Sequence, residues 1–173
     1  MTDEIDPLDP YTLELRVGAA LRARGWILCA AESCTGGLIL SRLTDIPGSS
    51  AYIAGGVVAY SYEAKQMLLG VRAKTLARFG AVSHQTADEM ARGALTRFDA
   101  DIAISVTGIA GPDGGMPDKP VGLVYIGVAA RDGIIADEVL VQRYLWDGDR
   151  LANKRASVDA ALRLVLAICG GGA

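Results

Sequence analysis

The sequence has few residues that could build a metal site or a disulfide framework. Its 173 residues include one histidine, His84, and three cysteines, Cys29, Cys34 and Cys169, with no Cys-x-x-Cys pair. Metal-binding boxes combine Cys and His at short spacings, and disulfide frameworks need an even number of cysteines. We therefore expect no bound metal, no cofactor and a reducing compartment, the cytoplasm.

Long apolar runs and a surplus of positive charge are missing as well. No apolar stretch reaches the ~18 residues that a membrane span needs, and the first residues, Met1 to Asp6, are acidic where a signal peptide is basic. The formal net charge is -3, so no excess of cations is available to neutralise nucleic-acid phosphates. These absences predict a soluble cytoplasmic protein whose partners are neither membranes nor nucleic acids.

Two nucleotide-binding signatures are also absent. The chain contains neither the Gly-x-x-x-x-Gly-Lys-Ser/Thr of a P-loop nor the Gly-x-Gly-x-x-Gly of a dinucleotide fold. Both the NTPase and the dinucleotide-dehydrogenase interpretation therefore lose their support. What the chain does have is 51% hydrophobic residues and 21 glycines, a composition that favours a tightly wound α/β protein.

Apolar runs and helical patterns alternate along the chain, which has the length of one domain. We expect a tail over residues 1–9 and one domain over 10–169. The expected strands are 26–31, 53–60, 101–106, 123–130 and 134–144, and the expected helices are 10–24, 38–43, 61–69, 72–79, 83–98 and 147–169. Asp132-Gly133 predicts a hairpin between the last two strands. The pattern is typical of a three-layer αβα sandwich with a mixed sheet.

The first candidate site lies around the second expected strand. Ser50 belongs to a Pro-Gly-Ser-Ser turn before the strand, Tyr60 ends it, and Lys65 lies about one turn into the helix that Ser61 caps. A lysine whose pKa is lowered can serve as base for a serine nucleophile, and a phenol can orient the hydroxyl or relay its proton. Such residues are also ordinary on protein surfaces, so the pattern by itself leaves a surface interpretation open.

The second candidate site, Ser33-Cys34-Thr35-Gly36-Gly37, joins the first expected strand to a helix. Free amides at a helix N-terminus bind anions, so the loop is either a phosphate cradle or a tight turn that needs glycine for packing. Cys34 is a rival nucleophile, because a thiol at a helix N-terminus has a lowered pKa. A small buried cysteine is the simpler interpretation.

The third candidate site, Thr107-Gly108-Ile109-Ala110-Gly111, follows the third expected strand. Its small residues could form an amide nest for an anion or for a developing oxyanion. The alternative is a flexible surface loop. Arg150, in the first turn of the last helix, could hold a phosphate through two hydrogen bonds, or it lies on a solvated face.

Several longer motifs follow one another in a recognisable order. They are Ala31-Glu32-Ser33-Cys34-Thr35-Gly36-Gly37, Gly48-Ser49-Ser50, Tyr60-Ser61 with Glu63-Ala64-Lys65, Gly80-Ala81-Val82-Ser83, Ser105 with Thr107-Gly108-Ile109-Ala110-Gly111-Pro112, Lys119-Pro120-Val121-Gly122 and Gly148-Asp149-Arg150. Over residues 10–169 this set resembles the C-terminal domain family of the competence-damage protein CinA, which includes a stand-alone nicotinamide mononucleotide deamidase. Tyr62 stands where that family usually has asparagine.

The resemblance implies an αβα sandwich that hydrolyses nicotinamide mononucleotide to nicotinate mononucleotide and ammonia, without metal, in pyridine-nucleotide (NAD) recycling. By position, it places the catalytic serine, tyrosine and lysine on Ser50, Tyr60 and Lys65, and the substrate contacts on 33–37, 107–111 and Arg150. It also implies a dimer or a higher homo-oligomer. Two alternatives stay open: a nucleotide-binding module without turnover, linked to competence or the DNA-damage response, and an amidase whose nucleophile is Cys34.

Overall fold

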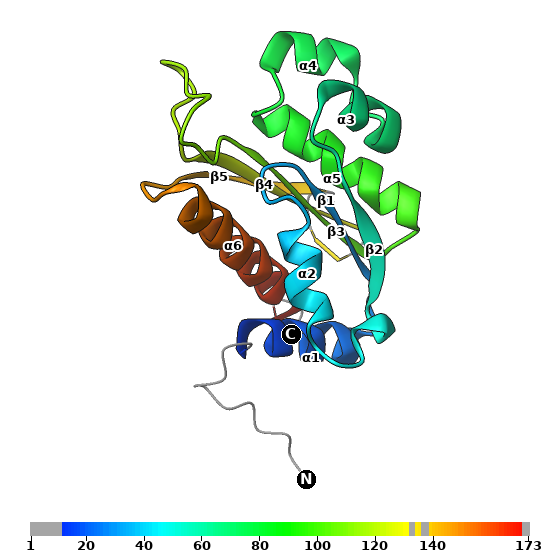
Figure 1. Ribbon diagram of the computed structural model, residues 1–173. Coiled ribbons are helices and arrows are strands. Elements are labelled where there is room, and N and C mark those ends of the chain that lie inside the picture. Colours follow the sequence, from blue (N-terminus) through cyan, green and yellow to red (C-terminus); the bar gives the residue numbers. More distant parts are fainter. Residues whose placement is uncertain (1–11, 132–133, 136–138, 171–173) are drawn as a thin grey trace.

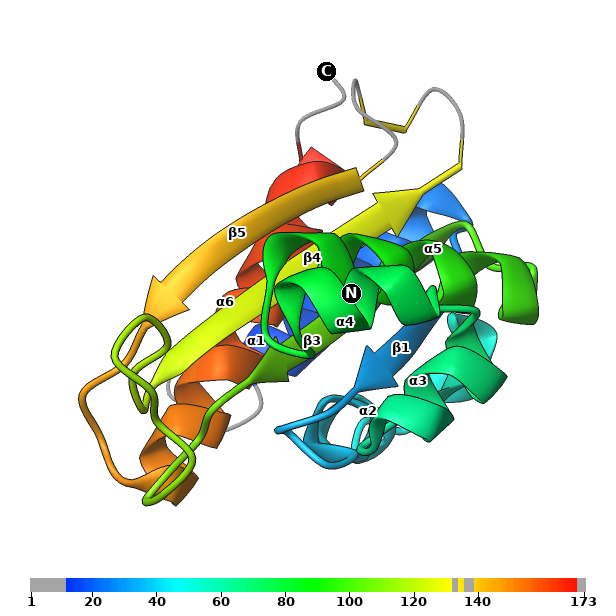
Figure 2. The same cartoon turned by 90° about the horizontal axis from the view of Figure 1, so that it is seen from above.

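The computed structural model describes residues 12–131, 134–135 and 139–170. Its five-stranded sheet has the order β2-β1-β3-β4-β5. The strands are β1 (Leu28–Glu32), β2 (Ile53–Val58), β3 (Ile102–Gly108), β4 (Leu123–Ala130) and β5 (Val139–Leu145). β1, β2 and β3 are parallel, whereas β4 runs antiparallel to both of its neighbours (Figure 2). The predicted mixed sheet is confirmed.

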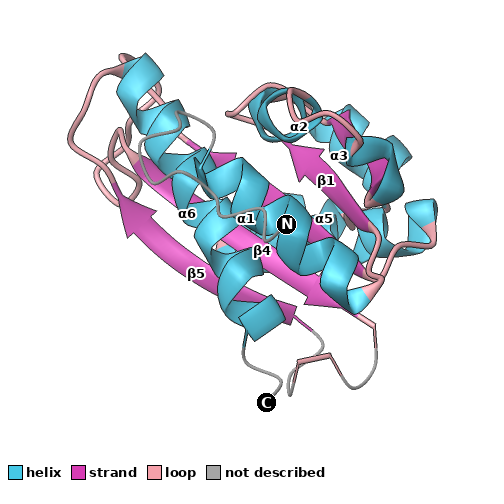
Figure 3. Cartoon of the chain, turned by 90° about the horizontal axis from the view of Figure 1, so that it is seen from below, coloured by secondary structure: helices cyan, strands magenta, loops and turns pink. Residues whose placement is uncertain are grey.

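Helices cover both faces of the sheet (Figure 1). On one face lie α1 (Thr12–Arg24), α2 (Leu38–Thr44) and α6 (Arg150–Gly170), of which α1 and α6 cross in front of the strands in Figure 3. On the other face α5 (His84–Phe98) contacts all five strands, and α3 (Tyr62–Leu69) and α4 (Ala73–Phe79) pack on α5. The predicted three-layer αβα sandwich is therefore confirmed.

Successive residues of β1 pack into two different hydrophobic cores, one on each face of the sheet. Leu28 and Ala30 join the core under α1, α2 and α6, while Cys29 and Ala31 join the core under α5. Successive residues of a strand point to opposite faces, so a uniformly apolar run is what a strand covered on both sides requires.

Small residues bring α5 close to its neighbours. Ser105 Oγ of β3 donates to the Ala87 carbonyl of α5 at 2.6 Å. A Cβ placed on Gly93 of α5 would lie 1.9 Å from the Leu69 carbonyl oxygen of α3, so only glycine allows this approach. The contact fixes α3, the helix that carries Lys65, against α5.

Helix caps follow the predicted residues. Ser61 Oγ accepts from the Ala64 amide at 3.0 Å at the start of α3, and Gly70 ends that helix with φ 67°. Ser83 caps α5 by accepting from the Thr86 amide. These local signals are strong because each cap satisfies a backbone group that the helix leaves free.

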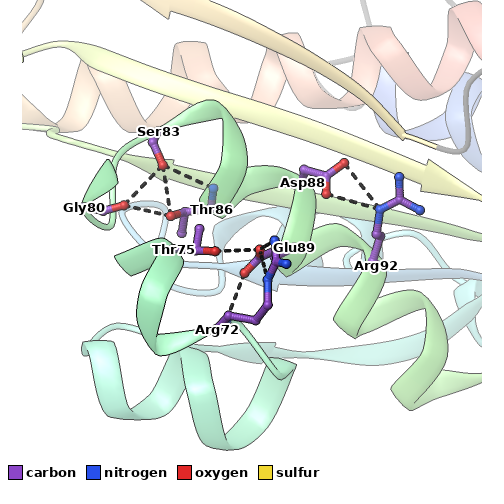
Figure 4. Close-up of polar contacts among 8 residues, drawn as sticks. All are labelled: Arg72, Thr75, Gly80, Ser83, Thr86, Asp88, Glu89 and Arg92. Carbon is purple, nitrogen blue, oxygen red and sulfur yellow. Dashed lines mark hydrogen bonds and ion pairs between the residues drawn. The ribbon is translucent and has the colours of Figure 1, made fainter. Parts of the chain in front are cut away.

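A polar cluster ties α4 and α5 together (Figure 4). Glu89 of α5 accepts from the Arg72 amide at 2.8 Å and from Thr75 Oγ1 at 2.7 Å, and it also pairs with the Arg72 side chain. Ser83 and Thr86 hold the Gly80 carbonyl at the turn between the two helices. The turn over residues 80–83 is therefore fixed where it approaches the end of β3.

Some predicted boundaries differ from the structure. The last helix begins at Arg150, and Asp149 Oδ1 accepts from the Ala152 amide at 2.8 Å. The prediction that Asp147 caps this helix is therefore wrong by two residues. The tail over 1–9 and the Asp132-Gly133 turn lie outside the described residues. Within the described ranges, no helix combines the length and apolar character that crossing a bilayer takes.

Candidate active site

The carboxyl ends of the three parallel strands bring the predicted motifs to one edge of the sheet. Ser33 directly follows β1, Tyr60 comes two residues after β2, and Thr107 is the next-to-last residue of β3. β2 and β3 flank β1 on opposite sides, so the order of the connections reverses at β1. Open α/β sheets bind ligands outside the carboxyl ends of the strands at such a switch point.

Lys65 and Ser33 form a buried hydrogen-bonded pair at this edge. The Lys65 side chain is 1% exposed, and its Nζ donates to Ser33 Oγ at 2.9 Å and to the carbonyls of Ala59 at 2.7 Å and Tyr60 at 3.2 Å. Burial lowers the pKa of Lys65 to about 8. When neutral, the amine has a lone pair for the Ser33 proton, which is the requirement for a serine–lysine nucleophile and base.

Ser50 lies at the opposite end of β2 from this pair. It is exposed in a short 3-10 helix, Ser49–Ala51, which precedes β2, whereas Tyr60 and Lys65 follow that strand. Six strand residues at ~3.3 Å each separate the two ends by about 20 Å. The prediction that Ser50 lies beside Lys65 is therefore wrong, and Ser33 occupies that position.

Glu32 accepts from three backbone amides at the N-terminus of α2, next to the loop that the sequence offered as a phosphate cradle. Its fully buried carboxylate accepts from the backbone N–H groups of Gly37 at 2.9 Å, Ile39 at 3.2 Å and Leu40 at 3.1 Å. A carboxylate at a helix N-terminus also interacts favourably with the helix dipole. The anion site at the start of α2 is thus filled from within, so a substrate phosphate does not bind the Gly37, Ile39 and Leu40 amides. Substrate contacts of Ser33, Cys34, Thr35 and Gly36 stay a prediction.

Cys34 and Thr35 lie next to Ser33 and are buried. Burial raises the pKa of the Cys34 thiol to about 11, so the thiol stays protonated at neutral pH and the simple buried-cysteine interpretation is confirmed. Within the described ranges, Thr35 Oγ1 has no hydrogen-bond partner. Among the same residues, neither the Cys34 nor the Thr35 amide has a backbone acceptor. Two N–H groups beside Ser33 therefore have no backbone acceptor among the described residues.

The loop after β3 is fixed by hydrogen bonds. Thr107 is buried, and its Oγ1 donates to the Ala81 carbonyl at 2.7 Å. The Ala110 carbonyl accepts from Asn153 Nδ2 of α6 at 3.1 Å. Gly108 still pairs with β4, and Ile109 N donates to the Leu123 carbonyl at 2.8 Å. The interpretation of residues 107–111 as a flexible surface loop is therefore wrong.

Arg150 connects two of the predicted motifs. Its guanidinium donates to the Gly111 carbonyl at 2.7 Å and to the Tyr60 phenol oxygen at 3.3 Å. The Tyr60 phenol thus contacts Arg150, while the Tyr60 carbonyl contacts Lys65. The Tyr60 side chain is 62% exposed, so its ring is accessible to a ligand.

Lys154 is a residue of this edge that the sequence analysis missed. A Cβ placed on Gly36 would lie 3.6 Å from Lys154 Nζ, so the amine reaches the loop that begins with Ser33. The positive charge of Lys154 also lowers the pKa of Cys34, against the larger effect of burial. Residues four apart share a helix face, so the position of Arg150 could have pointed to Lys154.

Tyr62 and His84 lie at the starts of α3 and α5. Tyr62 begins α3, and its phenol oxygen accepts from the Ala81 amide at 3.3 Å. It therefore has a polar contact of its own with the turn before α5. His84 is exposed at the start of α5. Within the described residues, no group of three or more His, Cys, Asp or Glu side chains could hold a metal ion.

Known proteins match this chain over most of its length. The profile of the CinA C-terminal domain matches residues 10–169. The nicotinamide-nucleotide amidohydrolase PncC of Enterobacter agglomerans is 49% identical over 156 residues, which are 90% of this chain and 93% of that protein. A CinA-like protein of Chloroherpeton thalassium is 54% identical over 153 residues, 88% of this chain. The chain spans only 36% of the length of that longer relative.

Solved structures agree with the fold. The competence/damage inducible protein CihA from Agrobacterium tumefaciens has a TM-score of 0.87 at 44% identity, covering 95% of this chain and 98% of that one. A CinA superfamily protein from Escherichia coli has a TM-score of 0.83 at 33% identity, covering 94% of each chain.

Proposed function

Because the chain belongs to the CinA C-terminal domain family, we propose that it hydrolyses the carboxamide of nicotinamide mononucleotide to nicotinate mononucleotide and ammonia. The Enterobacter agglomerans relative, which this chain matches over nearly its whole length, is named a nicotinamide-nucleotide amidohydrolase. The observation that carries the proposal is the buried hydrogen bond between Ser33 Oγ and Lys65 Nζ. The reaction would serve pyridine-nucleotide recycling, and its partner is a small cytoplasmic metabolite.

In this mechanism Ser33 is the nucleophile and Lys65 the base. Neutral Lys65 accepts the hydroxyl proton as Ser33 Oγ attacks the carboxamide carbon, and a tetrahedral oxyanion forms. Lys65 then returns the proton to the nitrogen, the C–N bond breaks, and ammonia leaves an ester on Ser33. Water attacks that ester with Lys65 as base again, which releases the carboxylate and restores the hydroxyl. No step is assigned to a metal ion.

Two further groups support the reaction. The Cys34 and Thr35 amides adjoin the nucleophile, and among the described residues they have no backbone acceptor. They are suited to bind the oxyanion, because preorganised N–H donors act most strongly where water is excluded. The exposed ring of Tyr60 offers a face to the pyridinium cation of the substrate. We assign Tyr60 to orientation of the substrate, in place of the proton relay.

The test is ammonia release from nicotinamide mononucleotide by the purified protein in the presence of a chelator. We expect the wild type to be active and Ser33→Ala, shown to be folded by circular dichroism, to lose roughly 10³-fold or more in kcat. Ser50→Ala is the matched control, and we expect it to stay within about twofold of the wild type because its hydroxyl is remote from Lys65.

Two results would contradict the proposal. A wild type that binds nicotinamide mononucleotide by calorimetry and releases no ammonia would favour the binding module without turnover. A folded Ser33→Ala enzyme of normal activity would remove Ser33 from the mechanism. The expected dimer or higher assembly stays a prediction, which sedimentation would measure.

A further inference from the structure

Two cations of α6 point to the edge of the sheet where Ser33 lies. Arg150 reaches the Gly111 carbonyl and the Tyr60 phenol, and Lys154 reaches the loop at Gly36. Figure 1 shows the orange start of α6 beside the yellow-green loop that follows β3. Residues four apart lie on one face of a helix. The two charges therefore border the same edge from one side.

Carboxylates do not neutralise these cations within the described part of the chain. Among those residues, Lys154 has neither a hydrogen bond nor an ion pair, and Arg150 donates only to a carbonyl and a phenol oxygen. Glu32 is the acidic residue next to the loop, but its carboxylate faces the α2 amides. Within the described residues, an otherwise acidic protein thus has two positive charges without a partner anion beside its buried serine–lysine pair.

We propose that Arg150 and Lys154 together bind the phosphate of the mononucleotide, a subsite that rests on the proposed function. The helix N-terminus after the glycine-rich loop does not serve, because Glu32 already accepts from the Gly37 amide and from the Ile39 and Leu40 amides of α2. An arginine and a lysine on adjacent helical turns match a phosphate dianion, which takes paired N–H donors from the guanidinium and a point charge from the ammonium. The carboxamide, at the other end of the substrate, is then directed to Ser33.

This subsite makes the enzyme selective for nucleotides over nucleosides. Nicotinamide riboside has the same carboxamide and the same pyridinium ring but lacks the phosphate. The wild type should therefore hydrolyse it with a much higher KM than the mononucleotide, and the difference should depend on Lys154. Added salt should raise the KM of the mononucleotide more than that of the riboside, since salt screens charge interactions.

Lys154→Met is the decisive variant, because the described residues offer the amine no hydrogen bond whose loss would disturb the fold. We expect its KM for nicotinamide mononucleotide to rise roughly 10- to 100-fold, the size of one charge-assisted hydrogen bond, with kcat within about twofold. The kinetic constants for nicotinamide riboside should not change. Lys74→Met, at an exposed position of α4, is the matched control and should leave both substrates unaffected.

An unchanged KM for the mononucleotide in Lys154→Met would overturn the subsite. An equal loss on mononucleotide and riboside would also overturn it, since it would indicate a structural role. If the wild type releases no ammonia, the proposed function fails, and calorimetry still tests the subsite. In that case the subsite is supported if the wild type binds the mononucleotide more tightly than the riboside and Lys154→Met abolishes this difference. Equal affinities of the wild type for the two ligands overturn the subsite.

Discussion

Two serines in small-residue turns have opposite surroundings. Ser33 is 7% exposed and accepts a hydrogen bond from Lys65, whereas Ser50 is exposed before β2. Both stand in motifs that resemble the same family, and both turns contain glycine. The difference is the end of the strand to which each belongs: Ser33 follows β1, and Ser50 precedes β2.

Strand direction therefore decides which residues can meet. The residues after β1, β2 and β3 share one edge because these strands are parallel, and the residues before them share the other. Lys65 comes after β2, so a partner from another connection must lie at the same edge, as Ser33 does after β1. Substitutions at the edge that holds Ser33 and Lys65 should therefore affect the reaction, whereas Ser50→Ala at the other edge should not.

Removal of the Lys65 amine should have the largest effect. We expect Lys65→Met to lower kcat by roughly 10³-fold or more, because Ser33 then has no proton acceptor. Lys65→Arg should not restore activity, since a guanidinium stays protonated and cannot act as the base. Ammonia release is the measurement. A comparable loss of kcat in Ser50→Ala would contradict the claim that only the edge with Ser33 and Lys65 takes part in the reaction.

The pH dependence of the rate should report the Lys65 amine. Burial lowers its pKa to about 8, and only the neutral amine accepts a proton. We therefore expect kcat/KM to rise roughly tenfold per pH unit below pH 8 and to level off above it. A rate that is constant from pH 6 to 9, or that falls as the pH rises through 8, would contradict Lys65 as the base.

Glu32 should matter for stability at the edge that holds Ser33. Glu32→Ala leaves the Gly37, Ile39 and Leu40 amides without their acceptor, and we expect the free energy of unfolding to fall by about 3 kcal/mol. Urea unfolding measures it. Asp113→Ala, at an exposed loop position, is the control and should not move the midpoint. A wild-type midpoint in Glu32→Ala would show that the cap does not hold α2 in place.

Cys34 should have the smallest effect of the residues at this edge. Its thiol is buried with a pKa raised to about 11, so it is neutral at pH 7 and a poor nucleophile. We expect Cys34→Ala to release ammonia within about twofold of the wild-type rate. Loss of activity in Cys34→Ala together with full activity in Ser33→Ala would select the thiol as nucleophile.

Much of the fold could be predicted from local sequence signals. Ser61, Ser83 and Gly70 cap their helices as expected, and the uniformly apolar runs became the strands of a sheet covered on both faces. These features depend on neighbouring residues, whose backbone groups the caps satisfy.

The site was less predictable, because its contacts join distant parts of the chain. Ser33 and Lys65 are 32 residues apart, and proximity in the sequence favoured Ser50. Glu32 takes the α2 amides only because its side chain turns toward the helix that follows. The direction of β2 could have excluded Ser50 from the sequence alone, because a strand separates Ser50 from Lys65.

The most direct test of the mechanism is to identify which serine carries the acyl group. The enzyme would be mixed with nicotinamide mononucleotide, quenched in acid within milliseconds and digested with trypsin, which cleaves after Arg42 and so separates residues 25–42 from 43–65. We predict a nicotinate mononucleotide adduct on the 25–42 peptide, placed on Ser33 by fragment sequencing and absent from Ser33→Ala. An adduct on Ser50, in the 43–65 peptide, would contradict the account.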